Sequence, residues 1–333
     1  MPALRTAFIG CGGIARAHAN VLAGLPERVQ MVAFCDVVRE RAQAFADEYA
    51  KGAGLVFTDG AHMLDELKLD LVYICLPPFA HTNEVELAAG RGAHIFIEKP
   101  IALNMEVADR MVAAVERTGV KSQVGFVLRF GDAVEAAKRE LDSGEAGPPA
   151  LMIGKYMTNS LHSAWWRDRS RSGGQVVEQI IHVYDMARFL LGEATEVYAG
   201  MDNLFHREIA DYTVEDVAAA VVHFDGGAWA TISSTNCAIP NQWLSQWEVV
   251  TRNRTMRFDN ANCAVFHHTD QRWPRTTTIN SDRNMLLGET LDLLDAIEDD
   301  GPTRTPISEG AKSLRLVLGV NESAATGKPV KLG

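Results

Sequence analysis

Two groups of residues in this 333-residue chain have the types and spacing needed for proton chemistry. The first is the tripeptide Glu98-Lys99-Pro100, in which the lysine follows a short apolar run almost directly. An ammonium group held at the end of a buried strand can polarise an oxygen that gains or loses charge during a reaction. Taken alone, a lysine at a strand end is more often a solvated surface charge. Its interpretation therefore depends on the residues around it.

The second group is Glu178, His182 and Asp185, which follow Gly173-Gly174. If a helix begins near Gln175, the three residues stand at i, i+4 and i+7 and share one stripe of that helix. Histidine titrates near neutral pH, and a nearby carboxylate stabilises its charged form. His182 is therefore a candidate general base with Glu178 as its partner, although an exposed polar stripe without function explains the spacing equally well.

A glycine-rich turn, Gly10-Cys11-Gly12-Gly13-Ile14-Ala15, follows the first apolar run of the chain. It matches Gly-x-Gly-x-x-Ala, in which the first glycine permits a tight turn, the second lets the backbone approach a pyrophosphate, and the small last residue packs on the strand. The helix that begins there offers free N–H groups to phosphate. An isolated match is weak, and a turn without a ligand is the alternative. We predict a dinucleotide site that uses Gly10, Gly12, Gly13, Ile14 and Ala15.

An acidic residue, Asp36, closes the second apolar run about 20 residues after the glycine turn, where a carboxylate meets the ribose hydroxyls of adenosine. A carboxylate at this point repels a 2′-phosphate, so we predict NAD as the cofactor and regard NADP as less favoured. Arg39 and Arg41 lie close in sequence and could still accept a phosphate. The other interpretation is that Asp36 caps the helix that begins near Arg39.

The elements that position these residues are predicted from short apolar runs that alternate with amphipathic helical stretches between Arg5 and Val124. This alternation is typical of βαβ units and predicts an α/β Rossmann domain, a doubly wound parallel sheet. The candidate strands are Thr6–Ile9, Met31–Cys35, Leu55–Phe57, Leu71–Cys75, His94–Ile97 and Lys121–Val124, and the candidate helices include Arg39–Tyr49, Thr82–Arg91 and Met105–Thr118. Because ligands bind at the carboxyl ends of parallel strands, we expect cofactor contacts after the fourth and fifth strands, from Leu76, Pro77, His81, Glu98 and Lys99.

After Gly125 the pattern changes to that of an α+β domain. Asp225-Gly226-Gly227 separates two strand-like runs and predicts an antiparallel hairpin. The expected strands are Leu151–Thr158, Glu196–Gly200, Val217–Phe224, Ala228–Asn236, Trp247–Thr251 and Met256–Phe258, and the expected helices are Asp132–Leu141, Gln175–Leu191 and Ser308–Ala325. The sequence thus predicts two domains, residues 1–125 and 126–333.

Composition and charge narrow the class of partner to a small molecule. A net charge of −11 without any Lys/Arg run disfavours nucleic acid and anionic membranes. No apolar stretch approaches the ~20 residues that span a bilayer. The five cysteines are widely spaced, and the start of the chain reads as a strand and not as a secretion signal, so we expect a cytoplasmic protein.

Two other kinds of catalysis lack support in the sequence. Glu178 and His182 could ligate a metal from one helix, but no third ligand of suitable spacing is visible, and His267-His268 lies in a predicted strand whose adjacent side chains point to opposite faces. We therefore expect no catalytic metal. No nucleophile elbow or catalytic cysteine signature is present either.

Taken together, these residues resemble the glucose-fructose oxidoreductase and inositol dehydrogenase family, Gfo/Idh/MocA. The resemblance covers nearly the whole chain and rests on the glycine turn, Asp36, Pro77 with His81, the Glu98 tripeptide, the segment from Gly173 to Gly192, and the ending Gly327-Lys328-Pro329-Val330. It implies hydride exchange between a nicotinamide and a secondary hydroxyl or ketone of a sugar, cyclitol or related polyol. It also implies an open, mainly antiparallel sheet in the second domain and a homodimer or homotetramer.

By position, the resemblance implies that Lys99 hydrogen-bonds the reacting oxygen, that His182 takes its proton during oxidation, and that Asp185 holds a substrate hydroxyl. Glu178 stands where the family usually has aspartate. Gln175 and Ile180 replace glycines that are common in the family, and both reshape the pocket. Lys99, His182 and Glu178 are expected to converge on the nicotinamide although they belong to different domains.

Aromatic residues before the Gly173-Gly174 step are expected to line the mouth of the substrate site, because flat indoles can cover the C–H faces of a sugar. They are Trp165, Trp166 and Arg167, together with Tyr156, and more loosely Asn159, Arg129 and Asn236. Packing of both indoles in the core is the alternative. A regulatory protein that senses a nicotinamide or a sugar without turnover is the competing function, and the presence of both Lys99 and His182 favours an enzyme. Reduction of an imine or an activated ring is a further alternative.

Overall fold

The computed structural model describes residues 2–333, which form two compact units. The first unit contains residues 2–126 and 286–311, and the second contains Val127–Met285 and Lys312–Gly333. The sequence placed residues 286–311 in the second domain, whereas in the structure they pack with the first. None of the helices within residues 2–333 is both long and apolar enough to cross a membrane.

The first unit is built on a six-stranded parallel sheet with the order β3-β2-β1-β4-β5-β6, the doubly wound arrangement that the sequence predicted. All six predicted strands are present, with ends shifted by one or two residues at most. The strands are β1 (Leu4–Ile9), β2 (Val29–Cys35), β3 (Leu55–Phe57), β4 (Leu71–Ile74), β5 (His94–Ile97) and β6 (Ser122–Val124). The helices are α1 (Gly13–Ala23), α2 (Arg39–Tyr49), α3 (Gly60–Glu66), α4 (Glu84–Gly90), α5 (Met105–Thr118) and α10 (Met285–Glu298), with a 3₁₀ turn η1 (Pro78–Ala80).

The core of the first unit explains why a late segment of the chain belongs to it. Central strands such as β4 are buried on both faces, as is usual when helices cover a parallel sheet on both sides. Tyr73 stacks on Phe96 with ring centroids 4.7 Å apart. Leu293 and Leu294 of α10 are fully buried in the same core. The segment after α10 contacts β6, because the backbone N–H of Val124 donates to the carbonyl oxygen of Thr305 at 2.7 Å.

The second unit is built on a nine-stranded sheet with the order β14-β13-β12-β11-β7-β10-β9-β8-β15. Among its described pairs only β7 with β10 is parallel, so the sheet is mainly antiparallel, as the family resemblance implied. The strands are β7 (Pro149–Met157), β8 (Ala194–Asp202), β9 (Val217–Phe224), β10 (Trp229–Thr235), β11 (Leu244–Thr251), β12 (Arg254–Asn260), β13 (Cys263–His268), β14 (Arg275–Ile279) and β15 (Val330–Lys331). The helical segments are η2 (Val127–Phe130), α6 (Asp132–Asp142), α7 (Ala164–Arg167), α8 (Arg169–Ser172), η3 (Val176–Ile180), α9 (Ile181–Leu191) and α11 (Ile307–Thr326).

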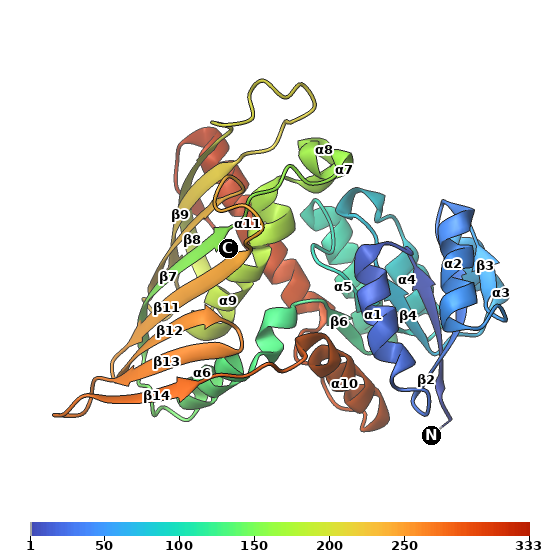
Figure 1. Ribbon diagram of the computed structural model, residues 1–333, viewed down its shortest axis with the longest axis horizontal. Helices are drawn as coiled ribbons and strands as arrows, with labels where there is room; N and C mark the ends of the chain where they lie inside the picture. The colour runs from blue at the N-terminus through green and yellow to red at the C-terminus, as the bar shows by residue number, and fades with distance from the viewer. Residues whose placement is uncertain (1) are drawn as a thin grey trace. The chain divides into compact units, whose positions relative to one another are not determined.

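Helices cover one face of this sheet, and Figure 1 shows α9 lying along it. Side chains along β9 and β10 alternate between buried and exposed, which follows from the two-residue period of a strand. The predicted hairpin is present, since β9 and β10 pair in antiparallel register from Val217 opposite Thr235 to His223 opposite Trp229. β14 was not predicted, because its residues Arg275 to Ile279 are mostly exposed and carry no apolar alternation.

One predicted helix differs in its first turn. The segment Gln175–Leu191 was expected to be a single α-helix, but Val176–Ile180 is π-helical and α9 begins only at Ile181. A π-helical turn holds more residues than an α-helical turn, so side chains on either side of it no longer follow the α-helical spacing. The α-helical spacing assumed for Glu178, His182 and Asp185 therefore does not hold over the first turn, and their placement on one stripe stays a prediction.

Candidate active site

The glycine turn after β1 has the conformation that a dinucleotide site needs. Gly10 has a φ of +91°, and a Cβ placed there would lie 2.4 Å from the carbonyl oxygen of Cys75, so only glycine fits. Gly12 immediately precedes α1, and a Cβ on Gly12 or Gly13 would meet no atom within 4 Å. Ala15 is fully buried against the sheet. The outer side of the turn is thus open, with the N-terminus of α1 beside it.

Asp36 lies beside this turn and is 9% exposed. Its Oδ2 accepts the N–H of Cys11 at 2.9 Å, and its Oδ1 accepts the N–H of Val38, the residue before α2, at 2.9 Å. The carboxylate therefore joins the end of β2 to the glycine turn and to Val38, the residue before α2. Burial, and then the charge of Asp36, raises the pKa of the Cys11 thiol to about 12, so this thiol remains neutral. Asp36 is the fixed negative charge of the site.

The segment after β4 carries a buried histidine. His81 Nδ1 lies 2.5 Å from Glu84 Oε1, and the His81 contact holds the pKa of Glu84 below its usual value although burial alone would raise it. His81 Nε2 is buried and has no hydrogen-bond partner among residues 2–333. Leu76 lies next to Gly10, since a Cβ on that glycine would come within 3.3 Å of Leu76 Cδ2. A buried polar atom without a partner, in the segment that follows β4, fits contact with a polar ligand such as NAD.

Glu98 lies at the end of β5 and is directed inward, away from solvent. Its Oε1 is 2.7 Å from His18 Nε2, and its Oε2 accepts the backbone N–H of Lys99 at 3.1 Å. Gly125 packs against the same carboxylate, because a Cβ there would come within 2.9 Å of Glu98 Oε2. The carboxylate thus fixes the backbone of Lys99. Lys99 itself is half-buried.

Glu289 on α10 forms a cluster with His18 and Glu98, and the sequence analysis did not identify it. It is fully buried, its Oε1 lies 3.9 Å from His18 Nδ1, and neither of its carboxylate oxygens has a hydrogen-bond partner among the described residues. Burial, and then the charge of Glu98, raises the pKa of Glu289 well above its ordinary value. It could not be found from sequence because it lies 191 positions after Glu98 in the numbering of the chain.

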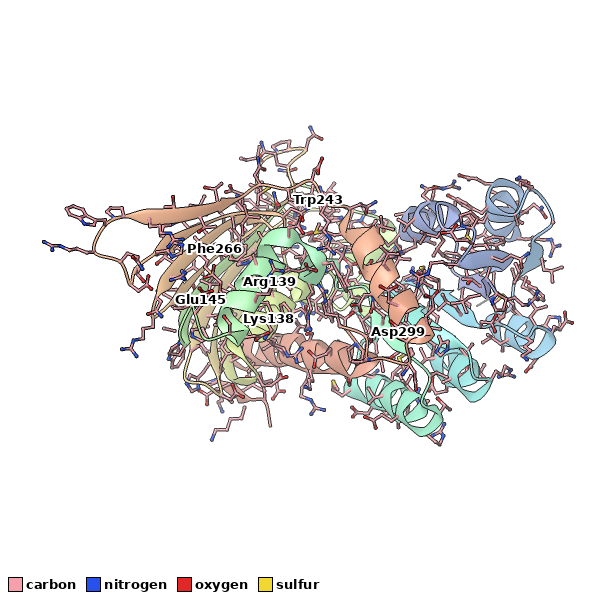
Figure 2. All side chains as sticks on the ribbon, turned by 90° about the horizontal axis from the view of Figure 1, so that it is seen from below. Lys138, Arg139, Glu145, Trp243, Phe266 and Asp299 are labelled. Carbon is pink, nitrogen blue, oxygen red and sulfur yellow. The ribbon has the colours of Figure 1, made fainter. Side chains whose placement is uncertain are left out.

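In the second unit, Glu178 is linked to an aromatic cluster. Trp166 Nε1 donates to Glu178 Oε2 at 2.7 Å, and the rings of Trp166 and His162 are 4.1 Å apart. Trp243, labelled in Figure 2, lies 5.5 Å from His162 in an edge-on arrangement and is 59% exposed. His162 and Trp243 were not predicted. The proximity of His162 in sequence to Trp165-Trp166 was the only available signal.

The residues expected at the substrate mouth occupy different environments. Trp166 is only 2% exposed and packs with Tyr212 and Val214, whereas Trp165 is half-buried, and their place at the substrate mouth stays a prediction. Arg167 Nη2 forms an ion pair with Asp211 at 2.6 Å. Of the more loosely expected residues, Tyr156 lies edge-on to Trp243, Asn159 donates to the carbonyl oxygen of Ala238, and Asn236 donates to the hydroxyl of Tyr212.

Asp185 and Arg129 form a buried ion pair inside the second unit. The guanidinium of Arg129 donates to both carboxylate oxygens, at 2.8 and 2.7 Å, and Ser313 of α11 donates to Oδ1 at 2.8 Å. His182, three residues earlier on α9, is half-buried. A substrate hydroxyl would have to displace one of the existing partners of Asp185. The sequence alone did not indicate that Asp185 pairs with Arg129.

The sheet order, the glycine turn and Asp36 are those of a Rossmann domain that binds a dinucleotide. Residues 4–126 match the family model described as an oxidoreductase family with an NAD-binding Rossmann fold, and residues 134–257 match the GFO/IDH/MocA C-terminal domain. The chain therefore belongs to the Gfo/Idh/MocA family, as the resemblance predicted. It is an NAD-dependent oxidoreductase.

Similar proteins are found among both curated sequences and solved structures. The chain is 31% identical to scyllo-inositol 2-dehydrogenase (NAD(+)) of Bacillus subtilis over 70% of this chain and 67% of that protein. It is 25% identical to myo-inositol 2-dehydrogenase of Thermotoga maritima over 99% of this chain and 98% of that protein. Its fold matches that of levoglucosan dehydrogenase, solved with NADH and L-sorbose, at a TM-score of 0.90 and 22% identity, covering 100% of both chains.

Proposed function

We propose that this protein is a dehydrogenase that oxidises a secondary hydroxyl of a sugar, cyclitol or related polyol, or reduces the corresponding ketone. Its relatives are named for inositols, and the levoglucosan dehydrogenase of similar fold was solved with L-sorbose. The observation that carries the proposal is the inward-facing carboxylate of Glu98, which fixes the backbone of Lys99 at the end of β5 in the NAD-binding unit. The aromatic cluster around Glu178 offers flat surfaces that suit the C–H faces of such substrates.

The residues of the first unit fit the cofactor. Gly10, Gly12, Gly13 and Ile14 would hold the pyrophosphate of NAD, and Asp36 the ribose hydroxyls of its adenosine half. His81 would direct its unpartnered Nε2 toward the ligand. When bound, NAD supplies the two-electron acceptor or donor of the reaction.

Proton handling falls to the protein's own side chains. Lys99 would donate a hydrogen bond from Nζ to the reacting oxygen and stabilise the negative charge that develops there. The imidazole of His182 would take the hydroxyl proton during oxidation and return it during reduction. Glu178 would stabilise the protonated imidazole, and its bond to Trp166 Nε1 limits the positions that its carboxylate can adopt.

We propose a positioning function for Asp185 in place of the substrate contact that the resemblance implied. Its carboxylate is occupied by Arg129 and Ser313, so it fixes α9 to η2 and α11. His182 stands one helical turn before Asp185 and depends on that anchorage for its direction. Trp165 and Arg167, which are half-buried, remain the proposed contacts at the substrate mouth.

The proposal is tested by NAD reduction over myo-inositol, scyllo-inositol, levoglucosan and L-sorbose. General acid–base help is worth about 10²–10⁴ in rate, so His182→Ala should lower kcat by a factor in that range and leave NAD affinity nearly unchanged. Lys99→Ala should also lower kcat, whereas Lys68→Ala, which alters an exposed lysine shortly before the amino end of β4, should not. Turnover that is absent for every polyol, or equal in wild type and His182→Ala, overturns the proposal and favours a nicotinamide- or sugar-sensing protein.

We also propose that the protein is a cytoplasmic homodimer or homotetramer. Ile153, Thr231, Val221 and Tyr198 lie in register across β7, β10, β9 and β8, on the exposed face of the nine-stranded sheet. Three of these four exposed residues, Ile153, Val221 and Tyr198, are large hydrophobics, and an exposed apolar patch is typical of an interaction surface. All five cysteines are free thiols, which suits a reducing compartment. Light scattering of the purified protein would report a monomer if the oligomer proposal is wrong.

A further inference from the structure

A second cluster of ionisable side chains lies in the second unit, at one end of β9 and β10. His206, Asp216 and Cys237 each present one donor atom, and these atoms all lie within 4.8 Å of one another. Asp216 immediately precedes β9, and Cys237 follows β10 by two residues. Because Val217 pairs with Thr235, the strand register brings Asp216 and Cys237 to the same edge. His206 reaches them from the loop between β8 and β9.

The distances in this cluster suit a tetrahedral metal ion. Zinc binds nitrogen and oxygen at about 2.0–2.1 Å and thiolate sulfur at about 2.3 Å, which requires about 3.3–3.7 Å between neighbouring ligand atoms. His206 Nδ1 lies 3.7 Å from Cys237 Sγ and 3.1 Å from Asp216 Oδ2. The third pair, Cys237 Sγ and the Asp216 carboxylate, lies within 4.8 Å, so side-chain adjustment would be needed to complete the geometry. Such adjustment is available because His206 and Cys237 are only half-buried.

Hydrogen bonds from the backbone already hold the carboxylate in place. Asp216 is fully buried, its Oδ1 accepts the N–H of Leu204 at 2.8 Å, and its Oδ2 accepts the N–H of Phe205 at 2.7 Å. Outer hydrogen bonds of this kind orient carboxylates that ligate metals and leave further lone pairs for the ion. The buried Asn236 places a further oxygen, its Oδ1, 3.4 Å from Cys237 Sγ.

We propose that His206, Asp216 and Cys237 bind a Zn²⁺ ion, with water or Asn236 Oδ1 as the fourth ligand. A set of one nitrogen, one sulfur and one carboxylate oxygen selects zinc over Mg²⁺ and Ca²⁺, which prefer oxygen ligands throughout. The negative charges of a thiolate and a carboxylate balance the charge of the ion. The residues are separated in sequence without any recognisable metal-binding spacing, which is why the sequence pattern predicted no metal.

The ion would hold residues beside the proposed substrate region in place and would take no part in the reaction. The His206 ring lies 4.5 Å from Tyr212, and Tyr212 lies 6.4 Å from Trp166, which donates to Glu178. Zinc would therefore fix the loop between β8 and β9 underneath the aromatic cluster. This inference concerns a site separate from Lys99 and His182 and does not depend on the identity of the substrate.

The test uses the full-length protein without an affinity tag, stripped with a chelator and titrated with Co²⁺ as a spectroscopic substitute for Zn²⁺. We expect one Co²⁺ per chain, visible bands of a tetrahedral ion, and a near-ultraviolet charge-transfer band from cobalt–thiolate bonding. Cys237→Ser should abolish the charge-transfer band. Cys263→Ser, which alters another half-buried free cysteine of the same unit, should retain it.

A second variant keeps the test decisive if one substitution disturbs folding. His206→Gln should weaken Zn²⁺ binding by about tenfold or more and should remove the rise in Tm that Zn²⁺ gives the wild type by mass action. The proposal is overturned if the wild type shows no cobalt–thiolate band, or if that band survives in Cys237→Ser. Equal stabilisation of wild type and His206→Gln by Zn²⁺ would also overturn it.

Discussion

Glu98 shows how a single carboxylate can connect a sequence motif to the core. One of its oxygens contacts His18 and the other accepts the N–H of Lys99, so the motif lysine is anchored by a residue that does not itself need to meet the ligand. Glu289 lies on the other side of His18 and is the acid without a hydrogen-bond partner among the described residues. A buried carboxyl group in such surroundings is more stable when protonated.

This burial predicts a pH-dependent cost of folding. The pKa of Glu289 is raised in the folded protein, so its contribution is most favourable below the unfolded-state pKa near 4.5 and is lost as the pH rises toward the folded-state value. Glu289→Gln does not titrate and should be more stable than wild type at pH 8, by about 1–3 kcal/mol. Urea unfolding at pH 5 and pH 8 measures the difference. A gap between the two proteins that does not widen with pH would show that Glu289 is ionised in the fold.

Asp36 gives a test of the choice between NAD and NADP. Its two oxygens accept the N–H groups of Cys11 and Val38, so Asp36→Ala would disturb the turn as well as the charge. Asp36→Asn removes the charge and keeps one of the two acceptors, so it disturbs the turn less than Asp36→Ala does. Because a carboxylate repels a 2′-phosphate, Asp36→Asn should improve NADP affinity relative to NAD by about tenfold, equivalent to about 1.4 kcal/mol. Fluorescence titration with NAD and with NADP measures the two affinities. If their ratio is the same in wild type and Asp36→Asn, the assignment of Asp36 to the adenosine ribose is wrong.

At the scale of elements, the sequence predicted the sheets much better than the detailed site. Strands such as β3, β5 and β9 have the bounds that apolar runs indicated. A buried strand can be recognised because its apolar residues are consecutive or alternate with polar ones. The π-helical turn Val176–Ile180 has no such signature. The pair of Arg129 with Asp185 joins residues 56 positions apart, and no local pattern reports so distant a partner.

That ion pair gives a prediction about α9 as an element. Removing one partner of a buried pair leaves an uncompensated charge, which typically costs about 3–5 kcal/mol. Arg129→Met should therefore destabilise the protein by about that amount in urea unfolding. Arg129→Met combined with Asp185→Leu should recover much of the loss, because neither charge then remains buried alone. If the two substitutions are simply additive, the pair does not hold α9 to η2.

Another variant, Asp185→Asn, distinguishes a positioning function of Asp185 from a substrate contact. Asp185→Asn retains a group that can hydrogen-bond Ser313 and a substrate hydroxyl, but it weakens the attachment of α9 to Arg129. A positioning residue acts on His182, so we expect kcat to fall and its pH profile to change while KM remains nearly constant. A rise in KM with unchanged kcat would instead identify a substrate contact.

At the scale of the whole molecule, the chain enters its first unit twice. Residues 2–126 form the sheet, and residues 286–311 return to it after most of the second unit has been completed. Sequence patterns place a boundary where composition and periodicity change, which is near residue 125. They do not show that a helix 160 or more positions later covers the earlier sheet, because α10 has an apolar face that could pack on either unit.

The return of residues 286–311 gives a test of where the domains divide. Leu294 is fully buried in the core that includes Phe8 and Tyr73, so Leu294→Ala should cost about 2–5 kcal/mol through lost burial and a cavity. NAD stabilises the unit that binds it, so calorimetry with and without NAD identifies which thermal transition belongs to that unit. We expect Leu294→Ala to lower the Tm of the NAD-sensitive transition and to weaken NAD binding modestly. As a matched control, Leu190→Ala in the second unit should lower the NAD-insensitive transition. If Leu294→Ala acts only on the NAD-insensitive transition, residues 286–311 belong energetically to the second domain, and the simple boundary near residue 125 describes the protein.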